Sequence, residues 1–296
     1  MKDKLKGLYS THYKKLFFLP LVLLLLGIII LANNYLTNGD IIDKDVSLKG
    51  GTIATIYTSQ EFSTLQEQLA VQFPGKEFVV QYLTEFSTGV SLGVVVEVSD
   101  IEPDALHAAL EEITGLALTP ENYSVEFIGG SLGESFYQQM LVAILLAFLF
   151  MAIVVFVTFR SPVPSFAVVF AAFADMVCTV AFLSLFGMQF STAGIAAVLL
   201  LVGYSIDTDI LLTTNMLRRN EAGLFEGVYR SMKTGLTMTA AAFAVMGVGY
   251  FVSSSLVIKQ MFLIIIVGLC FDVIMTYGMN AGLLFWYLKK KRGSVE

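Results

Sequence analysis

Two aspartates, Asp207 and Asp209, lie inside an apolar stretch of the sequence that is long enough to cross a lipid bilayer. The stretch runs from about Ser191 to Leu212, and at roughly 1.5 Å of rise per helical residue it spans the roughly 30 Å of a hydrocarbon core. A charge is costly to bury in lipid, so a carboxylate placed there usually has a function such as passing a proton. Chemistry at these positions would take place within the membrane.

The composition of the whole chain agrees with a membrane protein. Hydrophobic residues make up 56% of the sequence, charged residues only 14%, and the mean hydropathy is +0.76. These values exclude an ordinary soluble domain. We expect six transmembrane spans, near residues 16–32, 140–159, 164–186, 191–212, 235–252 and 260–288.

The placement of lysine and arginine indicates the orientation of these spans. Basic residues gather in the N-terminal segment 1–15, after the second and fourth spans, and in the C-terminal tail 289–296. By the positive-inside rule these segments are cytoplasmic, so the loop 33–134 is extracytoplasmic. We therefore expect a multi-pass protein of the cell (plasma) membrane with both termini in the cytoplasm.

Two further aspartates, Asp175 and Asp272, lie in other spans. Counted along a helix, both fall roughly 16–18 Å into the membrane, near its middle, whereas Asp207 lies closer to the cytoplasm. We therefore expect a ladder of four proton-relay candidates across the bilayer. No lysine or arginine lies near the middle of any span, so these carboxyls have no obvious basic partner within the chain.

Helical geometry separates Asp207 from Asp209, because residues two apart point about 200° away from each other. We rank Asp207 first as the proton carrier, although spacing does not decide between the two. The alternative is that protonated aspartates only form hydrogen bonds between helices. Hydroxyl groups that can serve as partners are those of Ser191, Thr192, Ser205, Thr208, Thr213, Thr237 and Thr239.

The loop 33–134 carries sixteen acidic residues against three lysines, which argues against nucleic acid as a partner. Such a charge run is usually a solvated face; the alternative is attraction of basic segments or cations. Cys178 and Cys270 both lie in spans, so no disulfide can brace the loop. Its single histidine, His107, is expected on a helix surface. We predict no catalytic residue, no metal site and no cofactor.

The loop alternates between strand and helix patterns. Strands are predicted at 52–58, 78–83, 92–98 and 123–128, and helices at 62–73 and 103–113. The order β-α-β-β-α-β is typical of a ferredoxin-like fold. Glycines in the connecting segments 36–49 and 131–135 suggest that this domain moves as a unit, and we interpret it as a binding or gating module.

The expected fold class is therefore an all-α bundle of six transmembrane helices with an inserted α+β, ferredoxin-like extracytoplasmic domain between the first and second helices. Segment 135–288 supplies the other five helices of the bundle.

Two glycine-containing motifs flank the loop. The segment Asp45–Thr52 resembles the acid-x-x-x-x-GGT motif that follows the first span in the SecD/SecF family of Sec translocon subunits. The segment 129–134 resembles the family's glycine-rich sequence before the second span. The motif glycines are Gly50, Gly51, Gly129 and Gly133.

The membrane part extends the resemblance to almost the whole chain, which is identified as a family member of the archaeal type. The residues Gly203, Tyr204 and Ser205 resemble the family's I-G-Y-S element, and Arg218-Arg219-Asn220 resembles the tail that follows it. Where the family typically has N-D-T, this chain has Asp207-Thr208-Asp209, so the acidic residue is displaced by one position either way. Ala174 replaces a usual histidine, and Asp272 has no counterpart in the bacterial pattern.

The resemblance implies an auxiliary subunit of the Sec machinery. Such a subunit pairs with a SecD-like subunit in a heterodimer, works with the Sec channel and engages the translocating polypeptide on the outer face, with proton flow through the membrane aspartates. One alternative is an RND-type efflux permease for small molecules or lipids, which needs two such repeats or a homo-oligomer. Another is an intramembrane aspartyl protease, which needs two aspartates close together on facing helices.

Overall fold

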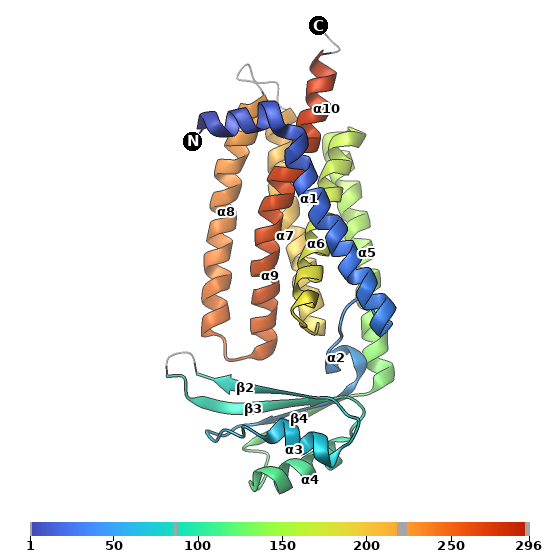
Figure 1. Cartoon of the computed structure of the whole chain (residues 1–296), viewed down its shortest axis with the longest axis vertical. Coiled ribbons are helices and arrows are strands. Elements are labelled where there is room, and N and C mark those ends of the chain that lie inside the picture. Colours follow the sequence, from blue (N-terminus) through green and yellow to red (C-terminus); the bar gives the residue numbers. More distant parts are fainter. Residues whose placement is uncertain (1, 86–87, 218–223, 294–296) are drawn as a thin grey trace.

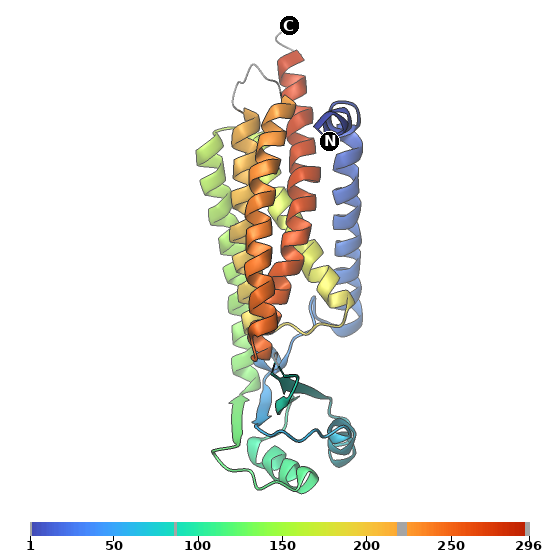
Figure 2. The same ribbon diagram turned by 90° about the vertical axis from the view of Figure 1, so that its left-hand side faces the viewer.

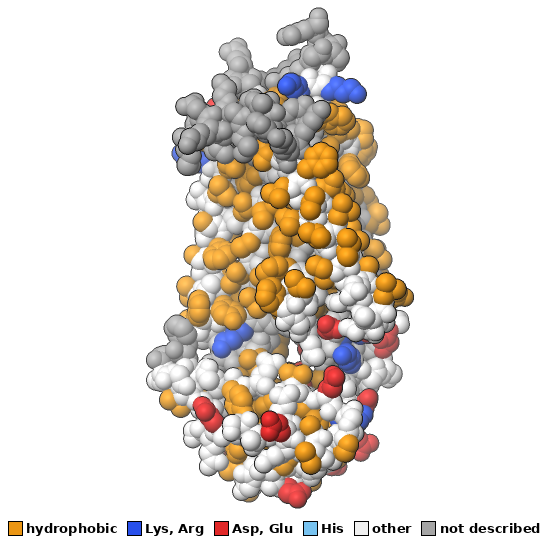
Figure 3. All heavy atoms as spheres, viewed as in Figure 1, with side chains coloured by type: hydrophobic (Ala, Val, Ile, Leu, Met, Phe, Trp, Pro, Cys, Tyr) orange, Lys and Arg blue, Asp and Glu red, His pale blue; other side chains and the backbone are white. Residues whose placement is uncertain are grey.

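Six helices in the described part of the chain are long and apolar enough to cross a membrane, which is the number expected from the sequence. The computed structural model describes residues 2–85, 88–217 and 224–293. Figures 1 and 2 show the long helices side by side, with a small sheet-containing domain at one end and both chain termini at the other. In Figure 3, hydrophobic side chains cover most of the visible face of the bundle.

Within the described residues, the long helices contain one break in regular α-helix, which lies in the last membrane-length run. Five of the long helices are α1 (Lys2–Asn38), α5 (Gly130–Phe159), α6 (Pro162–Leu185), α7 (Thr192–Leu217) and α8 (Leu224–Val252). The sixth run consists of α9 (Leu256–Ile274), the π-helix η1 (Met275–Asn280) and α10 (Ala281–Gly293). Helices α6 and α7 are the most buried, because α7 packs against α6, α8 and α9 while α1 and α5 cover α6.

Local sequence explains where several helices begin and end. Pro162 opens α6, where the missing N–H of proline is harmless. Ser255 caps α9 by accepting a hydrogen bond from the Ile258 N–H. In the small domain, α4 begins at Pro103 and ends at Gly115, which adopts the left-handed conformation that glycine tolerates.

The small domain is a four-stranded antiparallel sheet with strand order β2-β3-β1-β4. Its elements are β1 (Gly51–Ile56), α3 (Leu65–Gln72), β2 (Phe78–Thr84), β3 (Ser91–Val98), α4 (Pro103–Thr114) and β4 (Tyr123–Ile128). The order of strands and helices is the one expected from the sequence.

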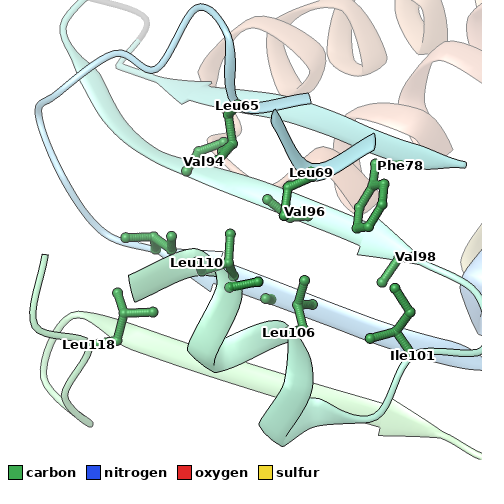
Figure 4. Close-up of a cluster of buried hydrophobic side chains, with 13 residues drawn as sticks. Leu65, Leu69, Phe78, Val94, Val96, Val98, Ile101, Leu106, Leu110 and Leu118 are labelled. Carbon is green, nitrogen blue, oxygen red and sulfur yellow. The ribbon is translucent and has the colours of Figure 1, made fainter. Parts of the chain in front are cut away.

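One face of the sheet forms the core of this domain. Val94, Val96 and Val98 of β3 are buried against Leu69 of α3 and Leu106 of α4, as Figure 4 shows. Successive strand residues point to opposite faces, so the residues between these valines face the other way. That second face is turned toward the ends of the membrane helices (Figure 1).

The junction between the sheet and the bundle consists largely of helix. Segment 131–135 is not a loop but the first part of α5, which begins at Gly130 directly after β4. On the other side α1 continues to Asn38, and a short helix, α2 (Val46–Lys49), precedes β1. Glycines at a helix start are compatible with a cap, and Gly129 serves as the N-cap of α5.

The glycines at this junction allow two backbones to touch. A Cβ on Gly133 would lie 2.8 Å from the amide nitrogen of Gly50 and 3.0 Å from the carbonyl carbon of Leu48. Gly50 has a φ of +87°, which favours glycine, and a Cβ there would collide with Gly130. The two motifs noticed in the sequence therefore pack directly against each other.

This close packing predicts different effects for two neighbouring glycines. Gly133→Ala should destabilise the protein by about 1–3 kcal/mol, because the added methyl group overpacks the junction. Gly129→Ala is the matched control, since a Cβ there has no atom within 4 Å. The measurement is the thermal unfolding midpoint of the purified protein in detergent. Equal midpoints for the two variants would contradict the proposed contact.

Candidate functional site

Asp272 of α9 lies at the centre of a group of hydroxyl donors inside the bundle. The hydroxyl of Ser205 donates to Asp272 Oδ1 at 2.7 Å, that of Thr208 at 3.1 Å and that of Thr276 at 3.2 Å. The Asp272 residue is 1% exposed. A buried carboxylate needs such donors because no water replaces them in an apolar interior.

Asp209 of α7 is paired with the side-chain amide of Asn280 in η1. Asn280 Nδ2 donates to Asp209 Oδ1 at 2.7 Å. Both residues are completely buried, and the second oxygen of Asp209 has no hydrogen-bond partner among the described residues. Asp209 therefore retains an unused acceptor.

Asp175 of α6 completes the group and is the least satisfied of the three acids. Within the described part of the chain, neither of its carboxylate oxygens has a hydrogen-bond partner, and the residue is 1% exposed. It lies close enough to Asp272 and Asp209 for their charges to interact with its own. We refer to these acids and their donors as the carboxylate cluster, which consists of Asp175, Ser205, Thr208, Asp209, Asp272, Thr276 and Asn280.

The π-helix η1 supplies two members of the carboxylate cluster. Asp272, Thr276 and Asn280 follow one another at intervals of four residues. In an α-helix such steps drift gradually around the axis, since a turn contains about 3.6 residues. The i→i+5 hydrogen bonds of a π-helix give a wider turn, so the three side chains stay closer to one face. Short π-segments of this kind are frequent at functional sites.

Asp207 lies outside the carboxylate cluster. It is exposed on α7 and lines an apolar groove with Tyr204 of the same helix, Met246 of α8 and Ile265 of α9. The predicted separation of Asp207 from Asp209 is confirmed. The predicted ladder is wrong, because Asp175, Asp209 and Asp272 gather in one place through the packing of α6, α7 and α9.

The other family-motif residues have mainly structural positions. The hydroxyl of Thr52 donates to the Ile101 carbonyl and fixes the start of β1. Gly51 has a φ of +145°, and a Cβ there would lie 2.8 Å from Ser99 Cα. A Cβ on Gly203 would meet nothing within 4 Å, so this glycine is not required for close packing within the chain. Segment 218–220 lies outside the described residues.

Asp45 connects the small domain to α7. Its carboxylate accepts hydrogen bonds from the backbone N–H of Ser47 at 2.9 Å and from the Ser47 hydroxyl at 2.6 Å, which caps α2. The Ser47 oxygen in turn accepts from the backbone N–H of Thr192, the first residue of α7. Burial raises the pKa of Asp45 above its usual value, while these hydrogen bonds oppose the shift.

Two neighbouring contacts strengthen this connection. The backbone around Lys44 pairs with Phe190, through bonds of 2.7 Å from Phe190 N–H to Asp43 and 3.1 Å from Asp45 N–H to Phe190. The Lys44 ammonium lies 4.4 Å from the centre of the Tyr137 ring on α5. The junction is therefore joined to α7 and to α5 at once.

Sequence reasoning identified the acids and two of the hydroxyl donors but missed Thr276 and Asn280. The spacing of four residues from Asp272 was the available signal. Among the described residues, no group of three or more histidine, cysteine, aspartate or glutamate side chains is arranged to hold a metal ion.

Comparison with known proteins gives the class of this chain. Residues 109–290 match the family described as protein export membrane protein SecD/SecF, C-terminal. The chain belongs to the SecD/SecF family.

The individual relatives are archaeal proteins of one kind. The protein-export membrane protein SecF of Pyrococcus furiosus is 36% identical over 99% of this chain and 97% of its own length. SecF of Methanolacinia petrolearia is also 36% identical, over 94% of each chain. The crystal structure of SecDF from Thermus thermophilus has a TM-score of 0.70 at 23% identity, which shows a shared fold. This chain covers 38% of that longer chain, and 94% of this chain is matched.

The unequal hydrogen bonding of the acids predicts opposite effects on stability. Asp175→Leu should stabilise the protein by about 1–3 kcal/mol, because it removes a buried carboxylate whose acceptors are unused. Thr208→Val should destabilise it by a similar amount, because Asp272 loses a donor. The measurement is the thermal unfolding midpoint in detergent.

Asp207→Leu is the matched control for Asp175→Leu. Because Asp207 is exposed in the groove, its replacement should change the midpoint far less than replacement of Asp175. A loss of stability in Asp175→Leu as large as that in Thr208→Val would show that Asp175 is well satisfied after all.

Proposed function

We propose that this chain is an auxiliary subunit of the Sec protein-translocation machinery, and that it pairs with a SecD-like subunit to assist polypeptide export. The observation that carries the proposal is the match to archaeal protein-export membrane proteins SecF over nearly the full length of both chains. The shared fold with SecDF supports it. No catalytic residue is assigned, since a transport subunit needs none.

The proposed arrangement places both termini in the cytoplasm and residues 33–134 outside the membrane. The distribution of basic residues supports this orientation. We also infer a ferredoxin-like fold for the small domain, with the β-α-β-β-α-β order and the strand order β2-β3-β1-β4 in support. A second, similar chain in the pair would give two related membrane bundles.

Within the membrane, we propose that the carboxylate cluster holds and passes the protons that are coupled to export. Three buried acids that lie close together can share protons and exchange them over short distances. The cluster's members are 0–1% exposed, which suits a proton better than a peptide awaiting cleavage. We therefore place Asp209 ahead of Asp207, which the sequence alone ranked first.

Helix α7 gives this proton site a mechanical connection to the small domain. It carries Ser205 and Asp209 in the cluster, and its first residue, Thr192, is bonded to Ser47 at the junction. A rigid helix that contacts both the cluster and the junction transmits small displacements from one to the other. We propose that changes in protonation move α7 and so bias the position of the domain.

Replacing single aspartates tests the proton role. Asp209→Asn should abolish the stimulation of polypeptide translocation by a proton gradient, because an amide cannot bind and release the proton, while assembly with the partner stays intact. Asp207→Asn is the matched control on the same helix and should retain most of the stimulation. The assay is translocation into membrane vesicles that contain the subunit pair. Normal stimulation in Asp209→Asn would reject the role.

Co-purification tests the subunit role itself. The chain, solubilised gently after cross-linking with a membrane-permeable reagent, should be recovered with a SecD-like chain as its main partner. The measurement is mass spectrometry of the cross-linked complex. Recovery as a stable homo-oligomer without a second, similar subunit would instead favour an efflux permease.

A further inference from the structure

A continuous cleft separates the small domain from the ends of the membrane helices. Two adjoining hollows of about 450 Å³ and about 540 Å³ share Asp45, Glu97, Leu256 and Val257 as lining residues. The cleft lies between the free face of the sheet and the α8–α9 connection, which Figure 1 shows facing each other. Its size is in the range of binding sites rather than of packing defects.

The sheet side of this cleft is lined by every second residue of its strands. Alternate residues of β1 and β3 line it, with Ile53 and Thr55 from the first strand and Val95 and Glu97 from the second. Because successive strand residues point to opposite faces, the side that is not used for the domain core supplies this lining. The cleft therefore crosses several strands and offers polar and apolar positions side by side.

The charges around the cleft are mainly negative. Asp45, Glu97 and Glu126 line it, and the cationic side chain that the described residues contribute is Lys259. Glu97 is only partly exposed and forms no ion pair with any described residue. A bound cation would stabilise such a partly buried carboxylate, because it supplies the missing counter-charge.

On the opposite wall the bundle offers apolar contacts. Leu256 and Val257 open α9 at the helix end that faces the sheet, and Val257 is 50% exposed. Apolar side chains left accessible beside acidic ones form an amphipathic surface. An extended chain with alternating basic and apolar side chains would match both walls.

We propose that this cleft binds an extended, positively charged polypeptide segment, with basic side chains against Glu97 and Glu126 and apolar side chains against Leu256 and Val257. The proposal rests on the proposed function in one respect, namely that polypeptide is the substrate being moved. It adds the place where the polypeptide is held and the kind of segment that is preferred.

The electrostatics of Glu97 give the proposal a pH signature. Burial, and to a lesser extent the nearby charge of Asp45, raises the pKa of Glu97 to about 7. Glu97 is therefore neutral below this pH and charged above it, so a cationic segment should bind more tightly at pH 8 than at pH 6. The other titratable groups that line the cleft are Asp45, Tyr57, Glu126, Tyr250 and Lys259.

The binding test uses the full chain in lipid nanodiscs and two fluorescent twelve-residue peptides. One alternates lysine with leucine, and the other alternates glutamate with leucine. The lysine peptide should bind more tightly, and the double variant Glu97→Gln, Glu126→Gln should weaken it by roughly tenfold, the size expected for two partly exposed ion pairs. Glu67→Gln, on exposed α3 away from the cleft, is the matched control and should leave binding unchanged.

Three further measurements locate the binding and define its failure. A photo-cross-linking residue at position 257 should capture the lysine peptide, whereas one at Leu149, on the outer surface of α5, should not. Lys259→Gln should tighten binding, and Glu97→Gln should remove the increase between pH 6 and pH 8. The proposal would be overturned if both peptides bound equally well, or if Glu67→Gln weakened binding of the lysine peptide as much as the double variant does. It would also be overturned if position 257 captured no peptide.

The outcome for the cleft is separable from the outcome for the export role. Loss of peptide capture together with normal partner recovery and export would reject the cleft alone. Failure of partner recovery with intact peptide capture would reject the subunit role alone.

Discussion

Burying three carboxylates in the middle of an apolar helix bundle sets the requirements for the rest of the membrane part. Water is not there to hydrogen-bond the acids, so donors must come from neighbouring helices. Ser205 and Thr208 on α7 reach Asp272 on α9, and Asn280 on η1 reaches Asp209. These bonds fix how α7 and α9 face each other, and the packing of α6 against both helices brings Asp175 in.

The same helix then links the membrane site to the domain outside the bundle. Asp45 and Ser47 hold the first turn of α7, while Gly50 and Gly133 let the end of α2 and the start of α5 meet backbone to backbone. A junction built from direct backbone contact transmits displacement better than a long loop does. The proposed cleft lies beside this junction and shares Asp45 with it. Under the proposed function, a movement of α7 would act on the walls of the cleft.

Much of this arrangement could be predicted from local patterns. Apolar stretches give six helices, alternation gives the order of strands and helices in the domain, and the glycine motifs give the family. The predictions failed where they depended on distance between elements. Asp175 and Asp272 were correctly placed within spans, yet depth along separate helices did not reveal that they meet Asp209 in one site. Segment 131–135 was expected to be a connection, yet it is the start of α5, because glycine is compatible both with a loop and with a helix start.

The sequence by itself determined that this is a membrane protein of the SecD/SecF family with costly acids in its spans, since hydropathy, charge and motifs are properties of the chain alone. Only the tertiary structure decided which acids lie together. Asp207 and Asp209 lie two residues apart in the same apolar stretch of sequence. The packing of α6 and α9 against one face of α7 buries Asp209 and leaves Asp207 outside. Helix packing, not the apolar pattern, selects which face of α7 is buried. A helix that is apolar all round can bury any of its faces.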